Sequence, residues 1–136
     1  MDKDMKILIV DDFATMRKVI RNLLKQIGYA KIIEAEDGRV AFKELKAQKI
    51  DFVISDWNMP NMTGYELLKA IRADGDLSKM PFLMVTAEAL HANVLQAVKA
   101  GVDDYVVKPF TSEVLGGKIE KIIKKYNAQE KQREER

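Results

Sequence analysis

The sequence predicts an α/β fold in which a doubly wound, five-stranded parallel sheet carries helices on both faces. Short apolar runs typical of strands recur along the chain, and each precedes a longer amphipathic stretch typical of a helix. Strict alternation of this kind favours a parallel sheet, whose strands are buried on both faces and are therefore nearly all apolar. The composition agrees, because 47% hydrophobic and 32% charged residues are ordinary for a globular domain.

Strands are expected wherever a short apolar run ends in a polar residue. The runs ILIV, FVIS and FLMV are apolar almost without interruption, as strands buried on both faces require. The expected strands are Lys6–Asp11, Lys31–Glu36, Asp51–Asp56, Pro81–Thr86 and Asp103–Lys108.

Helices are expected where apolar residues recur at three- and four-residue spacing. The expected helices cover residues 14–27, 38–48, 64–72, 90–100 and 112–126. Gly28 can end the first helix, and Thr63 followed by Glu66 forms a capping box that opens the third. Gly116 and Gly117 lie inside the last helix, where each costs about 1 kcal/mol relative to alanine. We therefore expect that helix to be weakly held or to pack at close backbone approach.

The domain organisation follows from length and charge. A chain of 136 residues suits one compact domain, which we assign to residues 1–126. Residues 127–136, NAQEKQREER, are charged and lack an apolar stripe. They form either a solvated extension of the last helix or a disordered, frayed tail.

Composition excludes several classes of function. The net charge is +2, with 23 basic and 21 acidic residues, so nothing indicates a nucleic-acid partner. The absence of cysteine excludes disulfides, thiolate metal sites and cysteine nucleophiles. The N-terminus lacks a signal peptide, and no segment approaches the roughly 18 to 20 apolar residues of a membrane helix. We expect a cytoplasmic monomer.

Polar residues follow four of the predicted strands. They are Asp11 and Asp12 after the first strand, Asp56 after the third, Thr86 after the fourth and Lys108 after the fifth. Ligands of doubly wound sheets bind outside the carboxyl ends of the strands. Each residue alone has an ordinary role as a turn former, cap or solvated charge, but together they indicate a functional site.

The chemistry expected at this site is metal-assisted phosphoryl transfer. Carboxylates crowded together raise one another's pKa unless a cation lies among them. Mg²⁺ prefers oxygen ligands and commonly takes one or two carboxylates, several waters and phosphate oxygens. A carboxylate such as Asp56 can attack a phosphoryl group, while Mg²⁺, Lys108 and Thr86 stabilise the phosphoryl charge.

Residues 5–125 resemble the receiver domains of bacterial response regulators, and most closely those of chemotaxis. The motifs that carry the resemblance are VDDFATMRKVIRNLLK, EAEDG, FVISDWNMPNM, ELLKAIRADG, LMVTAEA and YVVKPFT. The resemblance implies the flavodoxin-like (βα)5 receiver fold and a histidine kinase as phosphodonor. It assigns Asp56 as the phospho-acceptor and Lys108 as a contact of the phosphoryl group. Asp11 and Asp12 would form the acidic Mg²⁺ pocket, completed by the backbone carbonyl of Asn58.

The resemblance also implies a conformational switch. An added phosphoryl group gives the Thr86 hydroxyl a strong acceptor to approach, which vacates space for the ring of Tyr105. In this family the two movements are coupled. The resemblance also implies that the domain promotes its own dephosphorylation, at a rate tuned here by Asn58 and Glu88. It further implies a cis peptide bond at Lys108-Pro109. We therefore expect a signalling switch rather than an enzyme, with a cis bond at a position where trans is the general rule.

The expected partner surface combines the fourth helix with the fifth strand and fifth helix. Its residues are Leu90, His91, Val94, Val98, Tyr105, Val107, Phe110, Lys118 and Lys121. Leu90 and His91 replace basic residues of the chemotaxis regulators, and the Gly116-Gly117 pair replaces acidic helix formers. The single histidine, His91, is interpreted as a surface residue.

The expected partner is the flagellar motor switch, and a phosphatase is a further candidate. One alternative is a phosphorelay intermediate that passes the phosphoryl group to another histidine protein without binding the motor. Another is a magnesium phosphatase with an aspartyl nucleophile, but such enzymes place a D-x-D pair on the first strand, whereas Asp56 follows the third.

Overall fold

The computed structural model describes residues 3–87 and 91–134 and has the predicted α/β architecture. Five parallel strands form one sheet in the order β2-β1-β3-β4-β5. The strands are β1 (Lys6–Val10), β2 (Lys31–Ala35), β3 (Phe52–Asp56), β4 (Phe82–Thr86) and β5 (Asp104–Val107). The helices are α1 (Ala14–Ile27), α2 (Gly38–Ala47), α3 (Gly64–Ala73), α4 (His91–Lys99) and α5 (Ser112–Glu134).

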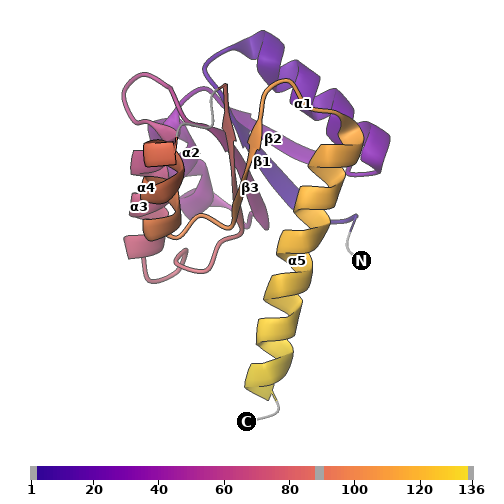
Figure 1. Ribbon diagram of the computed structural model, residues 1–136, viewed down its shortest axis with the longest axis vertical. Helices are drawn as coiled ribbons and strands as arrows, with labels where there is room; N and C mark the ends of the chain where they lie inside the picture. Colours follow the sequence, from indigo (N-terminus) through magenta and orange to yellow (C-terminus); the bar gives the residue numbers. More distant parts are fainter. Residues whose placement is uncertain (1–2, 88–90, 135–136) are drawn as a thin grey trace.

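Helices cover both faces of the sheet, with α1 and α5 on one side and α2, α3 and α4 on the other (Figure 1). The strand alternation produces the two layers of core. Ile7 and Ile9 pack on the α1 and α5 side, whereas Leu8 and Val10 pack on the α2 and α3 side. Each strand contributes side chains to both layers of the core, which explains why the strand sequences are almost continuously apolar.

The predicted helix boundaries have clear local causes. The Gly28 N–H donates to the carbonyls of Leu24 and Lys25, and its φ of 121° lies where glycine is favoured. The Thr63 hydroxyl accepts from the Glu66 N–H, and the Glu66 carboxylate accepts from the Thr63 N–H. The expected helix end at Gly28 and the capping box of α3 are both confirmed.

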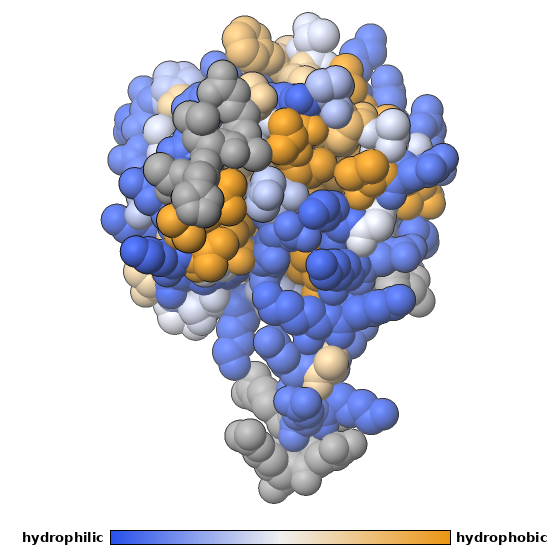
Figure 2. All heavy atoms as spheres, viewed as in Figure 1, coloured by the Kyte–Doolittle hydropathy of each residue, from blue (hydrophilic) through white to orange (hydrophobic). Residues whose placement is uncertain are grey.

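The last helix, α5, continues through residue 134, and residues 127–132 of this extension are exposed. This part projects beyond the rest of the molecule (Figure 1), and the residues of it that are coloured in Figure 2 are mostly hydrophilic. A methyl group added at Gly116 would lie 3.4 Å from Cδ1 of Ile27 on α1, at van der Waals contact, and one at Gly117 would meet open space. Neither position requires glycine for steric reasons.

None of the helices within residues 3–87 and 91–134 has both the length and the apolar character that crossing a bilayer demands.

Candidate functional site

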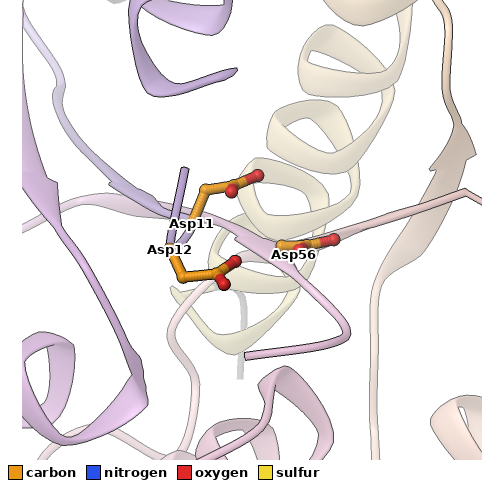
Figure 3. Close-up of side chains that lie close together, drawn as sticks. All are labelled: Asp11, Asp12 and Asp56. Carbon is orange, nitrogen blue, oxygen red and sulfur yellow. The ribbon is translucent and has the colours of Figure 1, made fainter. Parts of the chain in front are cut away.

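Three carboxylates lie together at the carboxyl ends of β1 and β3. Asp11, Asp12 and Asp56, here called the aspartate cluster, each place an oxygen within 4.8 Å of the others (Figure 3). Asp11 is fully buried and Asp56 is 8% exposed, whereas Asp12 is partly exposed. The central position of β1 and β3 in the sheet, where the strand order reverses, brings these residues to the usual ligand-binding crevice.

Lys108 supplies the positive charge nearest to the aspartate cluster. It follows β5, and its Nζ lies 3.3 Å from Asp11 Oδ2 and 3.3 Å from Asp56 Oδ1. One ammonium group therefore faces two buried carboxylates, and Asp12 adds a third negative charge beside them. The cluster keeps an excess of negative charge that a bound cation would neutralise.

Asp11 is held firmly by the backbone around it. Its Oδ1 accepts from the Phe13 N–H at 2.9 Å, and its own N–H donates to the Ala35 carbonyl at 3.1 Å. Nη1 of Arg17 on α1 donates to the Asp11 carbonyl at 2.7 Å. Sequence reasoning missed Arg17, because nothing in the pattern of α1 shows that this residue reaches back to the end of β1.

Asp12 shows that the cluster fits a hard cation. Its Oδ1 is buried and has no hydrogen-bond partner among the residues that the structure describes. A buried polar atom without a partner is costly, and an oxygen ligand of Mg²⁺ would be satisfied in this position. The donor set, made only of carboxylate oxygens, also matches the preference of Mg²⁺ for oxygen.

Burial raises the pKa of the Asp56 carboxyl above its ordinary value. The ammonium of Lys108 opposes this shift, and the negative charge of Asp11 adds to it. The protein alone therefore disfavours the ionised form of Asp56 relative to a carboxylate in water. A cation in the cluster would favour it.

Asn58 lies two residues beyond Asp56 in the exposed loop from β3 to α3. The Gly64 N–H donates to the Trp57 carbonyl at 2.9 Å and closes this loop. Gly64 approaches β3 so closely that any side chain there would collide with the carbonyl oxygen of Asp56. The sequence shows a glycine at this position, but only the three-dimensional contact shows why it is needed.

Thr86 and Tyr105 lie on neighbouring strands and line a common cavity. Thr86 ends β4, Tyr105 belongs to β5, and Val94 and Ala97 of α4 close the space between them. The cavity has a volume of about 10 Å³, close to that of a single water position. The cavity is therefore too small to hold the Tyr105 ring.

The described part of the expected partner surface is partly apolar and partly charged. Val98 is 59% exposed, Val107 is 38% exposed and Lys121 is exposed, whereas Val94, Tyr105, Phe110 and Lys118 are half-buried. Glu88 and Leu90 lie outside the described residues, and His91 begins α4 without a described side chain.

Two features of this surface were not predicted. Leu95 on α4 is 46% exposed, and it was not among the residues expected on the partner surface. Lys118 Nζ lies 3.2 Å from both carboxylate oxygens of Asp104 and 5.7 Å from the Tyr105 ring centroid. Because Lys118 is already paired with Asp104, it is less available to a binding partner than an unpaired surface lysine would be.

The Lys108-Pro109 peptide bond is cis, which confirms the expectation from the resemblance. Trp57 is partly exposed and stacks on Tyr65 with ring centroids 5.5 Å apart.

Comparisons with known proteins agree with this geometry. Residues 7–120 match the family model described as the response regulator receiver domain. The chain is 54% identical to chemotaxis protein CheY of Pseudomonas aeruginosa, over 90% of this chain and 99% of that protein. It is 50% identical to chemotaxis protein CheY-3 of Vibrio cholerae, over 92% and 96% of the two chains.

Solved structures show the same fold. The chemotaxis response regulator CheY4 of Vibrio cholerae is similar with a TM-score of 0.80 and 34% identity, over 88% of this chain and 98% of that chain. The receiver domain of a sensor histidine kinase of Pseudomonas aeruginosa is similar with a TM-score of 0.80 and 29% identity, over the same shares of both chains. That structure has a magnesium ion coordinated in its active-site cleft.

Proposed function

The chain belongs to the family of response regulator receiver domains, and on this premise we propose that it is a switch activated by phosphorylation of Asp56. The observation that carries the proposal is the aspartate cluster, with Lys108 placed 3.3 Å from two of its members. As a CheY-like receiver the chain acts in a two-component system, so its phosphodonor is a histidine kinase. We place this reaction in the cytoplasm.

The aspartate cluster and the backbone carbonyl of Asn58 are the proposed ligands of Mg²⁺. The unpartnered Asp12 oxygen and the excess negative charge support this assignment. The magnesium ion in the related sensor-kinase receiver supports it as well. When bound, the ion neutralises the charge of phosphoryl oxygens during transfer.

In the proposed transfer, a carboxylate oxygen of Asp56 attacks the phosphorus of a phosphohistidine. The oxygen–phosphorus bond forms as the phosphorus–nitrogen bond breaks, and the electron pair leaves with the imidazole nitrogen. Lys108 Nζ lies close enough to Asp56 Oδ1 to follow the negative charge onto the phosphoryl oxygens. Water later attacks the phosphorus as the bond between phosphorus and the Asp56 oxygen breaks, which releases inorganic phosphate and regenerates the carboxylate. We expect Asn58 and Glu88 to tune the rate of this step.

The proposed switch couples Thr86 to Tyr105. Phosphorylation places on Asp56 a phosphoryl group that carries a charge of about −1.5 to −2, which gives the Thr86 hydroxyl a strong acceptor. The cavity that these two side chains share is too small for the Tyr105 ring until Thr86 moves. Movement of Thr86 toward the phosphoryl group therefore lets Tyr105 turn inward and changes the surface formed by α4, β5 and α5.

The proposed output is binding of the flagellar motor switch at this changed surface. The chemotaxis names of the CheY relatives support this partner, and exposed apolar side chains on α4 and β5 offer a place to bind it. A phosphatase is a further candidate partner.

The acceptor is tested by Asp56→Asn. We expect the uptake of radiolabel from a small phosphodonor with Mg²⁺ to fall by at least about 100-fold, because the nucleophile is lost. Asp76→Asn is the matched control, since the Asp76 side chain is 90% exposed and lies outside the aspartate cluster. Undiminished labelling of Asp56→Asn would exclude Asp56 as the acceptor.

The output is tested with a peptide from the N-terminus of the motor-switch protein. We expect the phosphorylated chain to be retained on the immobilised peptide more strongly than the unphosphorylated chain. Equal retention of both forms, together with transfer of the phosphoryl group to a second histidine protein, would favour the phosphorelay alternative.

A further inference from the structure

The loop of residues 57–63 carries the backbone carbonyl of Asn58, a proposed Mg²⁺ ligand. A carbonyl oxygen belongs to the backbone, so its position depends on how the loop is held and not on a side-chain rotamer. The loop is bonded to the sheet at its first residue and is closed at its base. The Trp57 N–H donates to the Val85 carbonyl at 3.0 Å, and the Gly64 N–H donates to the Trp57 carbonyl at 2.9 Å.

The tip of this loop is held separately, by the start of α2. Asn61 Nδ2 donates to Asp37 Oδ2 at 2.9 Å, and the Gly38 N–H donates to the Met62 carbonyl at 3.2 Å. Asp37 is only 6% exposed, and its Oδ1 accepts from the Val40 N–H at 3.0 Å. One buried carboxylate therefore both caps α2 and holds the loop.

The backbone on both sides is adapted to this contact. Asn61 has a φ of 67°, a region that asparagine adopts more readily than most side chains. A Cβ at Gly38 would lie 2.7 Å from Met62 Cγ, so the approach of the loop requires glycine there. The hydrogen bonds from the Val40 N–H, the larger effect, and from the Asn61 amide hold the pKa of Asp37 below its usual value. The carboxylate that accepts from Asn61 therefore stays ionised.

The junction between β2 and α2 also bonds to a member of the aspartate cluster. The Ala35 carbonyl, at the end of β2, accepts from the Asp11 N–H at 3.1 Å. Residues 35–38 are thus bonded to Asp11 on one side and to the loop that carries Asn58 on the other. A segment that contributes no ligand itself fixes two parts of the proposed metal site relative to each other.

We propose that Asp37 and Asn61 are positioning residues for the divalent cation. Their hydrogen bond fixes the tip of the 57–63 loop and, through the loop, the position of the Asn58 carbonyl. This inference rests on the proposed function, because it assumes that the cation binds there. Groups that orient metal ligands without touching the metal commonly change metal affinity by about 10- to 100-fold.

The test is a Mg²⁺ titration of the full, unphosphorylated chain, followed by amide chemical shifts in two-dimensional NMR. Asn61→Gly keeps the left-handed backbone accessible and removes only the side-chain donor. We expect its dissociation constant for Mg²⁺ to rise about tenfold. The dispersion of the amide spectrum shows directly that the variant is folded.

A rescue separates positioning from a general loss of structure. Asn61→Asp alone places two carboxylates against each other and should also weaken Mg²⁺ binding. Combined with Asp37→Asn, it exchanges donor and acceptor and conserves the net charge. We expect this double variant to bind Mg²⁺ with nearly the affinity of the wild type.

Thr63→Ala is the matched control, because it removes the cap of α3 from the same loop and leaves the Asp37–Asn61 pair intact. Unchanged affinity in Asn61→Gly would overturn the positioning role, and so would equal weakening in Thr63→Ala. A wild-type chain that does not bind Mg²⁺ would overturn the proposed metal site itself and, with it, this inference.

Discussion

Aspartates are buried at both ends of the sheet, but the number of positive charges and hydrogen-bond donors around them differs. At the carboxyl end, Asp11 and Asp56 share one ammonium group, Lys108, at 3.3 Å. Asp12 beside them has a buried oxygen without a hydrogen-bond partner among the described residues. The negative charge at this end exceeds the positive charge that the described chain supplies there.

At the amino end, a single carboxylate is surrounded by donors. Asp103, with a side chain 4% exposed, accepts from Arg72 at 3.1 Å, from Lys125 at 2.9 Å and from the Tyr126 hydroxyl at 2.9 Å. The Phe82 N–H donates to it as well, at 2.8 Å. We call Asp103, Arg72, Lys125 and Tyr126 the Asp103 cluster.

The difference shows that burial of a carboxylate does not by itself indicate a functional site. The Asp103 cluster is satisfied and joins α3, β4 and α5, so it is expected to stabilise the fold. The aspartate cluster is left short of positive charge, so it is expected to bind a cation at some cost in stability. A surface groove of about 1080 Å³ lies at the amino end beside Tyr126, away from the aspartate cluster.

The largest effect on stability is expected from Asp103→Asn. The substitution leaves the guanidinium of Arg72, which is only 17% exposed, without its charge partner. Breaking one side of a buried pair of this kind should lower the free energy of unfolding by about 3 kcal/mol. Urea unfolding measures it, and the loss should be the same with and without Mg²⁺. A loss below about 1 kcal/mol would show that the comparison between the two ends is wrong.

A smaller effect is expected from Tyr126→Phe. The variant keeps the ring and removes only the hydroxyl that donates to Asp103, so the loss should be about 1.5 kcal/mol. Burial, followed by the charge of Asp103, raises the pKa of Tyr126 above its ordinary value, and the hydroxyl stays protonated as a donor at neutral pH.

The control for Tyr126→Phe is a chain that ends after Glu130. It removes only the end of the chain, where residues 131 and 132 are exposed, and keeps Tyr126, so its urea midpoint should match that of the full chain. An equal loss in the shortened chain would assign the effect to helix length and not to the hydroxyl.

The strands and helices could be predicted closely because alternation and spacing are local properties of the chain. The first helix was expected at residues 14–27 and spans Ala14–Ile27, and the first strand ends one residue earlier than expected, at Val10. The residues of the aspartate cluster and Lys108 could be named in advance because the carboxyl ends of parallel strands meet at one edge. Their roles in phosphoryl transfer stay predictions.

Pairs between distant side chains could not be predicted. The doublet Asp103-Asp104 is the same pair of letters as Asp11-Asp12, and the sequence does not show that Tyr126 donates to one of them. The contact of Asn61 with Asp37 is likewise invisible, because it depends on the path of the loop and on the position of α2. Such contacts depend on how the helices and loops pack in three dimensions, and the spacing of apolar residues along the sequence does not specify this packing.

The smallest effect is expected from Asp56→Asn without Mg²⁺, since Lys108 already offsets part of the cost of burying this carboxylate. Because burial raises the pKa of Asp56 in the folded state, the native protein binds more protons than the unfolded chain between the two pKa values. Stability contributed by this group is therefore full at low pH and is lost as the pH rises through the folded-state pKa. We expect Asp56→Asn to unfold at a higher urea concentration than the wild type at pH 7, and the gap to close on acidification.

Mg²⁺ should also reduce the difference in stability between Asp56→Asn and the wild type, because it stabilises the wild type more. A cation that binds only the folded wild type raises its stability in proportion to the logarithm of the ion concentration, and Asp56→Asn should gain less because one carboxylate ligand is gone. Asp103→Asn should gain as much as the wild type, since its cluster lies at the opposite end of the sheet. If Asp56→Asn instead unfolded before the wild type at pH 7 without Mg²⁺, the ionised carboxylate would be stabilising. The excess of negative charge at the carboxyl end would then not be the source of cation binding.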